Sequence, residues 1–310
     1  MLKILYLCDK KHWEHKLDRV RFHSIETIGN NTDVTVFKSG PGWDDFDNVK
    51  QVADKYNPDI ILWYKPLEMP GFDQVNDIPC CLRYNEMWDV RWTTEEIQRS
   101  GSSLILCHHQ NDIRQYGHIK TAEFFHNPHC VSKNIFRDYG LMRECDVLVT
   151  GALSPTHYPL RARFQRVINS EILRNFNCRI LRHPGYNIEN VEQQIVDYAT
   201  ELNKAKIVLA CSSKHRYALS KYVEVPLCKS LLCGDIPDEN HNWYKGWMLE
   251  IDNKMTNDEI AEKIAHYVVY SNDRNKLVEK GYSENVRHRT LDIYSKKFIG
   301  IVNNFLLKKG

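Results

Sequence analysis

The chain has 310 residues, enough for about two domains of ordinary size. Hydrophobic residues make up 42% and charged residues 26%, which is typical of a globular protein with a packed core. The 42 basic residues nearly balance the 40 acidic ones, for a net charge of +2. This balance does not support binding of nucleic acid or of a membrane surface through bulk positive charge.

The cysteines and the first residues indicate a compartment. None of the 10 cysteines has C-x-x-C spacing, and several lie in apolar runs, so we expect reduced, buried thiols. An apolar run begins at Leu2 without the features of a signal peptide. No stretch reaches the ~18 apolar residues of a spanning helix. We therefore expect a cytoplasmic protein with no membrane span.

Short apolar runs alternate with amphipathic segments along the first half of the chain. This alternation is the pattern of βαβ units and of a mostly parallel sheet. Strands are expected over residues 4–8, 34–37, 59–63, 78–82, 104–107 and 123–125. Helices are expected over residues 46–56 and 93–98. Pro58 should end the first helix, because proline disfavours helical geometry in the residue before it.

The same pattern restarts near residue 145, which indicates a second α/β domain. Strands are expected over residues 146–150, 178–181 and 207–210, and helices over 160–175 and 191–203. The tail is helical, over residues 259–270, 273–280 and 290–307, and Thr256 with Glu259 forms a capping box. The expected division is therefore a first domain of residues 1–143, a second of residues 144–286 and a C-terminal helical segment of residues 287–310.

A basic loop after the strand at 207–210 carries the most informative chemistry. It holds Lys214 and Arg216, and Lys221-Tyr222-Val223-Glu224 opens the next helix. The three cations could pair with a diphosphate, helped by the field of the helix N-terminus. Glu224 could accept hydrogen bonds from ribose hydroxyls. A solvated charged loop before an ordinary helix explains the same residues equally well.

Lys221-x-x-Glu224 is expected to open a helix that Gly234 closes, before a short strand at Ile236 and Pro237. This order resembles the donor-site helix of GT-B glycosyltransferases. The likeness is greatest to the spore-maturation-type branch, in which arginine usually stands where this chain has Lys221. Residues 146–161 resemble the start of that family's second domain, and residues 256–306 resemble its C-terminal helices. The resemblance implies a set of donor-binding residues: Gly151, Ser154, Lys214, Arg216, Lys221, Tyr222 and Glu224.

The resemblance also implies an architecture and a donor. Two Rossmann-like domains would face a cleft, and the last helix would cross back to the first domain. The donor would be a nucleotide sugar, linked to UDP or GDP, and neither a metal nor another cofactor is expected. Positive side chains would then stabilise the leaving diphosphate in place of a metal.

Candidate bases follow the strands of the first domain. Transfer with inversion needs a base for the acceptor hydroxyl, whereas retention needs none in that position. The resemblance favours His109 and Glu86, with Asp89 as a further candidate. His126, His129 and Trp13 could line the acceptor side, Trp13 by stacking on a sugar. A structural role explains each histidine singly, and a solvated helix explains the region of Trp13.

These features predict a metal-independent glycosyltransferase that moves a sugar from a nucleoside-diphosphate sugar to a hydroxyl of a glycan, a protein or another acceptor. Two alternatives stay open. One is an epimerase-type enzyme that uses the same donor without an acceptor, and the other is a non-catalytic module that binds a nucleotide sugar or a protein partner. A transferase acting on nucleic acid gains no support from the near-neutral charge.

Overall fold

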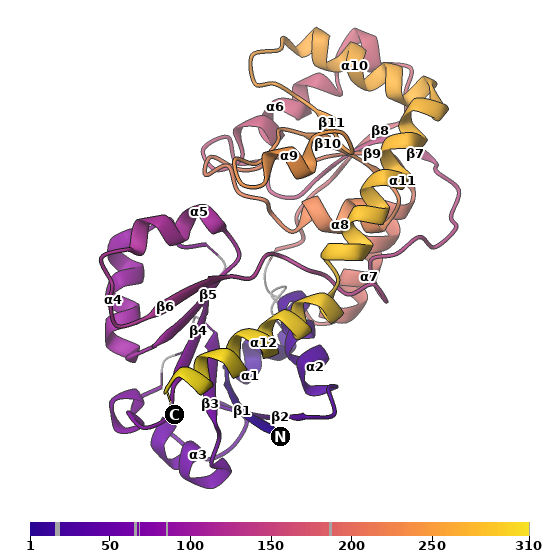
Figure 1. The fold of residues 1–310 in the computed structure, drawn as a ribbon. Helices are drawn as coiled ribbons and strands as arrows, with labels where there is room; N and C mark the ends of the chain where they lie inside the picture. The colour runs from indigo at the N-terminus through magenta and orange to yellow at the C-terminus, as the bar shows by residue number, and fades with distance from the viewer. Residues whose placement is uncertain (16–18, 65–66, 68, 85, 186–187, 310) are drawn as a thin grey trace. The chain divides into compact units, whose positions relative to one another are not determined.

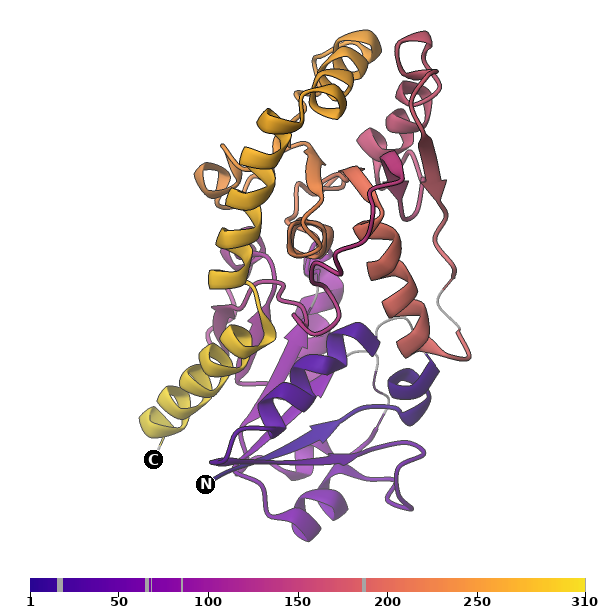
Figure 2. The same cartoon turned by 90° about the vertical axis from the view of Figure 1, so that its right-hand side faces the viewer.

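The chain forms two α/β units in the computed structural model, each built on one parallel sheet (Figure 1). The structure describes residues 1–15, 19–64, 67, 69–84, 86–185 and 188–309. Unit 1 comprises Met1–Pro128, Tyr186–Val191 and Leu291–Gly310, and unit 2 comprises His129–Gly185 and Glu192–Thr290. Both ends of the chain therefore belong to unit 1 (Figure 2).

Unit 1 has a six-stranded sheet in the order β2-β1-β3-β4-β5-β6, with every pairing parallel. Its strands are β1 (Leu2–Leu7), β2 (Val34–Ser39), β3 (Ile60–Tyr64), β4 (Cys80–Tyr84), β5 (Leu104–Cys107) and β6 (Glu123–His126). Its helices include α1 (Lys10–His15), α2 (Arg19–Gly29), α3 (Val49–Tyr56), α4 (Val90–Ser100), α5 (Gln110–Ile113) and α12 (Leu291–Lys309). All six predicted strands are confirmed, with shifts of one or two residues at their ends.

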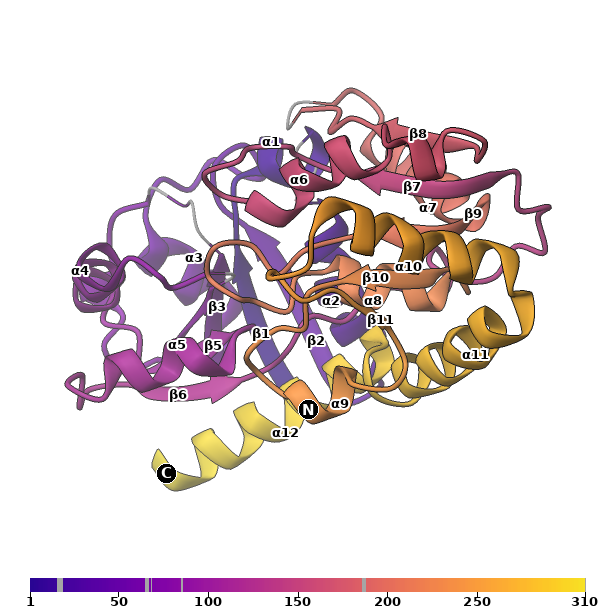
Figure 3. The same ribbon diagram turned by 90° about the horizontal axis from the view of Figure 1, so that it is seen from above.

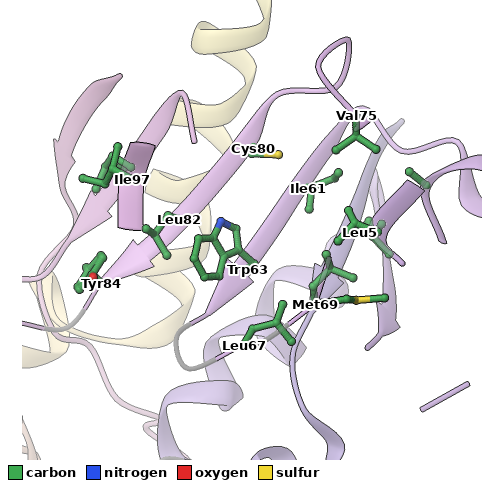
Figure 4. Close-up of a cluster of buried hydrophobic side chains, with 14 of the residues drawn as sticks. Leu5, Ile61, Trp63, Leu67, Met69, Val75, Cys80, Leu82, Tyr84 and Ile97 are labelled. Carbon is green, nitrogen blue, oxygen red and sulfur yellow. The ribbon is translucent and has the colours of Figure 1, made fainter. Parts of the chain in front are cut away.

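Helices cover both faces of this sheet, because successive side chains of a strand point to opposite faces. One set of strand residues packs with α3 and α4, as the cluster around Trp63 shows (Figure 4). The opposite face meets α2, where the ring of Phe22 lies 6.2 Å from Tyr6 and 5.5 Å from Tyr64. The near-continuous apolar runs of the sequence follow from this burial on both faces.

The C-terminal helix α12 packs on unit 1, as predicted. Asn31 Nδ2, just after α2, donates to Ser295 Oγ at 2.8 Å, and Lys308 Nζ lies 3.0 Å from Glu123 Oε2. The inward residues of α12, such as Phe298, are buried. The helix therefore completes the core of the first unit although it lies at the far end of the chain.

Unit 2 has a five-stranded parallel sheet in the order β11-β10-β9-β7-β8. Its strands are β7 (Cys145–Thr150), β8 (Cys178–Leu181), β9 (Ala205–Leu209), β10 (Leu231–Gly234) and β11 (Leu249–Glu250). Its helices are α6 (Pro159–Val167), α7 (Val191–Asn203), α8 (Lys221–Leu227), α9 (His241–Tyr244), α10 (Asn257–Val269) and α11 (Ser271–His288). Helices α6 and α10 pack together in the core of this unit (Figure 3), and the predicted capping box opens α10.

Three expectations about unit 2 need correction. The helix expected over residues 160–175 ends at Val167, where Asn169 Nδ2 donates back to Gln165 O at 2.7 Å and competes with helix continuation. Gly234 ends strand β10 rather than a helix, since α8 stops at Leu227. The helix expected over residues 273–280 is part of the longer α11.

The two units divide after Pro128, whereas the sequence pattern places the boundary after residue 143. Residues 129–143 form no helix or strand, so no periodicity assigns them to a domain. Arg143 anchors the end of this segment on unit 2. Its guanidinium donates to Ser230 Oγ at 2.8 Å, to Cys228 O at 2.9 Å and to Ala205 O at 3.1 Å.

The 10 cysteines form no disulfide, and most of their thiols are buried, as expected. Burial raises the pKa of Cys8 and of Cys80 to about 12, so both stay protonated and unreactive near neutral pH. Within the described part of the chain, no helix is long and apolar enough to cross a membrane.

Candidate functional site

Two loops meet where the sheet of unit 2 reverses its strand order, between β7 and β9. In open α/β sheets this is the place where ligands bind, outside the carboxyl ends of the strands. The loop after β7 begins at Gly151, and the loop after β9 leads to α8. The N–H of Lys214 donates to His157 O at 2.9 Å, which ties the two loops together.

Gly151 lets two basic side chains approach the backbone. Its φ of +98° lies in the region that favours glycine. A Cβ at this position would lie 2.9 Å from Arg161 Nη1 and 3.2 Å from Lys221 Cε. Any larger residue would therefore push into the space between the loop and these two cations.

Arg161 supplies the most firmly held of these charges. It lies on α6, its residue is only 3% exposed, and its Nη1 donates to Ala152 O at 3.1 Å. The guanidinium also stacks over the ring of Tyr158, 4.2 Å from the ring centroid. Among the described residues, its Nε has no hydrogen-bond partner. A buried charge with spare donors is suited to an anionic ligand.

His183, just after β8, belongs to the same cluster. Its Nδ1 accepts the N–H of Gly185 at 3.0 Å, which places the ring proton on Nε2 in the neutral form. Burial lowers the pKa of His183, and the charges of Lys221 and Arg161 lower it further. The N–H of Gly151 donates to Leu181 O at 3.2 Å, so His183 follows a strand end that is bonded to the glycine loop.

Lys221 opens α8 and completes the group, which we call the basic cluster (Arg161, His183 and Lys221). Burial lowers the pKa of Lys221 from 10.5 to about 8; Glu224 opposes this shift and Arg161 adds to it. Its Nζ lies 5.1 Å from the centroid of the Tyr198 ring. A bound anion would relieve the repulsion within the cluster and favour the charged form of Lys221.

Glu224 places one carboxylate beside the basic cluster. It is buried, and its Oε2 accepts the hydroxyl of Tyr198 at 3.2 Å. Burial raises the pKa of Tyr198 well above 10, and the nearby charge of Glu224 raises it further, so Tyr198 remains a donor. The pair can therefore orient a carboxylate toward the hydroxyls of a ligand held by the cations.

Arg216 and Tyr222 are both bonded within the protein, to the segment after β10. Arg216 Nη1 lies 2.6 Å from Asp235 Oδ2, and its Nε lies 3.0 Å from Asp238 Oδ1. Tyr222 is fully buried, with its hydroxyl donating to Asp235 O at 2.5 Å. These bonds fasten the loop after β9, in which Ser213 and Arg216 both have positive φ.

The other two expected donor residues lie in the same loops. Ser154 Oγ accepts the N–H of His157 at 3.4 Å, so it shapes the loop after β7. Lys214 is exposed. No sequence motif identified Arg161 or Tyr198 as candidate site residues. Both lie inside helices. His183 could have been noticed as a basic residue directly after an expected strand.

The expected acceptor residues lie in several segments of the chain. His109 is fully buried. Asp89 caps α4, its Oδ1 accepting the N–H of Trp92 at 3.0 Å. Trp13 belongs to the core: it is 6% exposed and stacks on Phe22 with centroids 5.0 Å apart.

The remaining candidates of the acceptor side are spread over three segments. Glu86 is exposed in the loop after β4. His126 lies on β6, and its Nε2 is 3.1 Å from His108 O. His129 is the first residue of unit 2. No group of three or more histidine, cysteine, aspartate or glutamate side chains among the described residues is placed to hold a metal ion.

The chain matches no protein-family model, and no curated protein matches it in sequence. It does resemble solved structures. A glycosyltransferase from Rickettsia africae has a TM-score of 0.62 at 13% identity, covering 100% of this chain and 99% of that one. The Anabaena protein HepE, in complex with UDP and glucose, has a TM-score of 0.62 at 10% identity, with 98% and 100% covered.

An epimerase has a similar fold. A putative UDP-N-acetylglucosamine 2-epimerase from Listeria monocytogenes has a TM-score of 0.57 at 10% identity, covering 99% of this chain and 97% of that one. Identities this low show likeness of fold alone. The two parallel sheets, the helices that cover them and the match along the whole chain show that this protein has the GT-B fold.

Proposed function

We propose that this protein is a glycosyltransferase whose nucleoside-diphosphate sugar binds at the carboxyl edge of the sheet of unit 2. The observation that carries the proposal is that Arg161 and Lys221 approach Gly151, whose N–H donates to Leu181 O, two residues before His183. Three basic groups with one carboxylate among them match a ligand that joins a diphosphate to hydroxyl-bearing sugars. The solved complex of HepE with UDP and glucose makes UDP the first nucleotide to test.

The chemistry of the proposed transfer follows from these side chains. As the bond between the sugar and the diphosphate breaks, negative charge grows on the leaving phosphate. Arg161 and Lys221 stabilise that charge, so the step proceeds without a metal. Glu224 accepts hydrogen bonds from the ribose hydroxyls. Exposed Glu86 is the candidate base for an inverting transfer.

The proposal has two finer parts. The motif order Lys221-x-x-Glu224…Gly234 supports a place in the spore-maturation-type branch, with lysine as a point charge where arginine is usual. The absence of a spanning helix among the described residues is compatible with transfer in the cytoplasm.

A thermal-shift comparison of nucleotides tests the donor site. Wild-type protein would be heated with UDP, GDP, dTDP and CDP, with ATP and NAD as controls. A ligand at 100 times its Kd stabilises the protein by about 2.7 kcal/mol, which is easily detected. Lys221→Ala should lose the shift, whereas Lys276→Ala, which removes a 78% exposed side chain on α11, should keep it. A shift that survives Lys221→Ala would count against the site.

Product analysis separates the proposed transfer from the epimerase alternative, which the Listeria neighbour favours at the level of the fold. A transferase releases the nucleoside diphosphate and moves the sugar to an acceptor or, slowly, to water. An epimerase returns a nucleotide sugar with one inverted centre and releases no diphosphate in that step. Binding of a nucleotide sugar without either product would support the non-catalytic module.

A further inference from the structure

One aromatic side chain from an irregular segment of unit 2 packs against the proposed donor site. Phe136 lies within residues 129–143, the stretch without helix or strand that begins this unit. Phe136 is 1% exposed, and its ring centroid lies 6.2 Å from that of Tyr198, with the two ring planes at 73°. This edge-to-face geometry is one of the arrangements that aromatic pairs prefer. Residues 129–143 therefore contact a side chain of the donor site.

Tyr198 contacts two charged side chains of α8. Its hydroxyl donates to Glu224 Oε2 at 3.2 Å, and Lys221 Nζ lies over its ring, 5.1 Å from the centroid. A rotation of the ring about the Cα–Cβ bond of Tyr198 would carry the hydroxyl away from the carboxylate. The orientation of this ring therefore decides whether the hydroxyl can fix the direction of Glu224.

The backbone next to Phe136 is fastened to α7, the helix that carries Tyr198. Asn203, the last residue of α7, is fully buried. Its Oδ1 accepts the N–H of Tyr139 at 2.8 Å, and its Nδ2 donates to Arg137 O at 2.9 Å. These bonds hold the segment of Phe136 in place relative to α7. A packed ring on such a support limits the orientations that are open to its aromatic neighbour.

We infer that Phe136 is a positioning residue of the donor site, which holds the ring of Tyr198 where its hydroxyl meets Glu224. Phe136 acts through Tyr198 and not by contact with the donor. A carboxylate whose direction is fixed in advance loses little freedom on binding, so it holds the ribose hydroxyls of the donor more tightly. The inference rests on the proposed function, because its ligand is the proposed nucleotide donor. It extends the donor site to a segment that no sequence motif marks.

Calorimetry of the full-length protein with UDP and with pyrophosphate tests this role. Phe136→Leu keeps an apolar side chain and removes the ring. It should weaken UDP binding about threefold, the scale of one aromatic pair. It should leave pyrophosphate binding unchanged, because pyrophosphate has no ribose. Phe176→Leu is the control: it removes a partly buried ring from the core of unit 2 and should change neither affinity.

A double-mutant cycle separates positioning from a general loss of packing. In Glu224→Ala the hydroxyl of Tyr198 has no carboxylate to orient, so the addition of Phe136→Leu should weaken UDP binding no further. Equal threefold losses in both backgrounds would overturn the inference, as would a parallel loss for UDP and pyrophosphate. Phe136→Met, which fills more of the same space, gives the same test if the leucine variant does not fold.

The wild-type protein distinguishes failure of this inference from failure of the proposed function. Binding of UDP by wild type and equally by Phe136→Leu would overturn the positioning role alone. Absence of UDP binding by wild type would overturn the proposed donor site, and the positioning role with it.

Discussion

The carboxyl edges of the two sheets differ in the chemistry that they present. In unit 2, Arg161 and Lys221 approach a glycine loop, and their charges are partly or fully buried. In unit 1, Trp88 and Trp92 are exposed among carboxylates, while His109 is buried. The two sheets share a parallel order with one reversal, so the difference comes from the loops that follow the strands. One edge presents basic side chains beside a glycine loop, and the other presents exposed aromatic rings and carboxylates.

Removal of the charge of Arg161 should weaken UDP binding more than any other change described below. Arg161→Met keeps much of the side-chain volume but removes the charge beside Gly151. A hydrogen bond to a charged group contributes about 2 kcal/mol, so UDP should bind about 30-fold more weakly. Arg166→Met, an exposed change on the same helix, is the control and should bind UDP normally. Calorimetry that finds the same affinity for both variants would exclude Arg161 from the site.

The pH dependence of UDP binding should report on Lys221, whose pKa is about 8. The diphosphate favours the protonated amine, and the free protein loses that proton as the pH rises above this value. Affinity should therefore be level below about pH 7.5 and fall by up to about tenfold per pH unit above 8. Lys221→Arg should bind equally well across this range, because arginine stays protonated.

The lowered pKa of Lys221 also affects the stability of the free protein, which should rise with pH, whereas the affinity for UDP should fall. The pKa of Lys221 is lower in the folded protein than in the unfolded chain, so between about pH 8 and 10.5 the unfolded chain binds more protons. The contribution of Lys221 to stability should therefore rise with pH through this window in wild type. Denaturant unfolding at several pH values should show this rise in wild type and its loss in Lys221→Arg.

Substitution of Glu224 should weaken the binding of the ribose without weakening the binding of the diphosphate. Glu224→Ala should weaken UDP binding about tenfold, because buried hydroxyls of the ligand lose their acceptor. Pyrophosphate has no ribose, so its affinity should not fall. Tyr198→Phe, which removes the hydroxyl that Glu224 accepts, should have a smaller effect on UDP. A parallel loss for UDP and pyrophosphate would show that Glu224 acts on the cluster itself.

Asp89 offers the smallest effect and tests the acceptor side. Asp89→Ala should lower the free energy of unfolding by about 1 kcal/mol, because the cap of α4 is lost. Asp89→Asn should retain that stability, since asparagine caps as well as aspartate. It should also retain sugar transfer. A folded Asp89→Asn protein with transfer reduced by orders of magnitude would make Asp89 the base instead.

Most elements of the fold could be predicted from local signals. The strands at 104–107 and 178–181 and the helix at 191–203 match β5, β8 and α7 residue for residue. Each is bounded by polar or turn residues and has a clear periodicity. Residues 129–143 have no periodicity, so their place on unit 2 was not predictable. At the early end of α6, the side chain of Asn169 donates to Gln165 O, a bond that periodicity does not record.

The candidate site was only partly predictable. Lys221 and Glu224 were identified from their spacing at a helix start. In the sequence, Arg216 and Lys221 are both basic residues near the start of a helix. In the structure, however, Arg216 forms an ion pair with Asp235, which lies 19 residues later in the chain. Such a pairing depends on β9 and β10 being neighbours, and spacing cannot distinguish a paired cation from a spare one.

The sequence by itself determined the alternation of strands and helices, the restart of the pattern near residue 145 and the type of residue at each strand end. Hydrogen bonding and burial of neighbouring residues set these features, and both act over short stretches of chain. The tertiary structure alone decided which cations meet. Arg161, His183 and Lys221 come from three segments, and the order β9-β7-β8 brings them to one edge. Strand order depends on packing of the whole unit, which no local pattern contains.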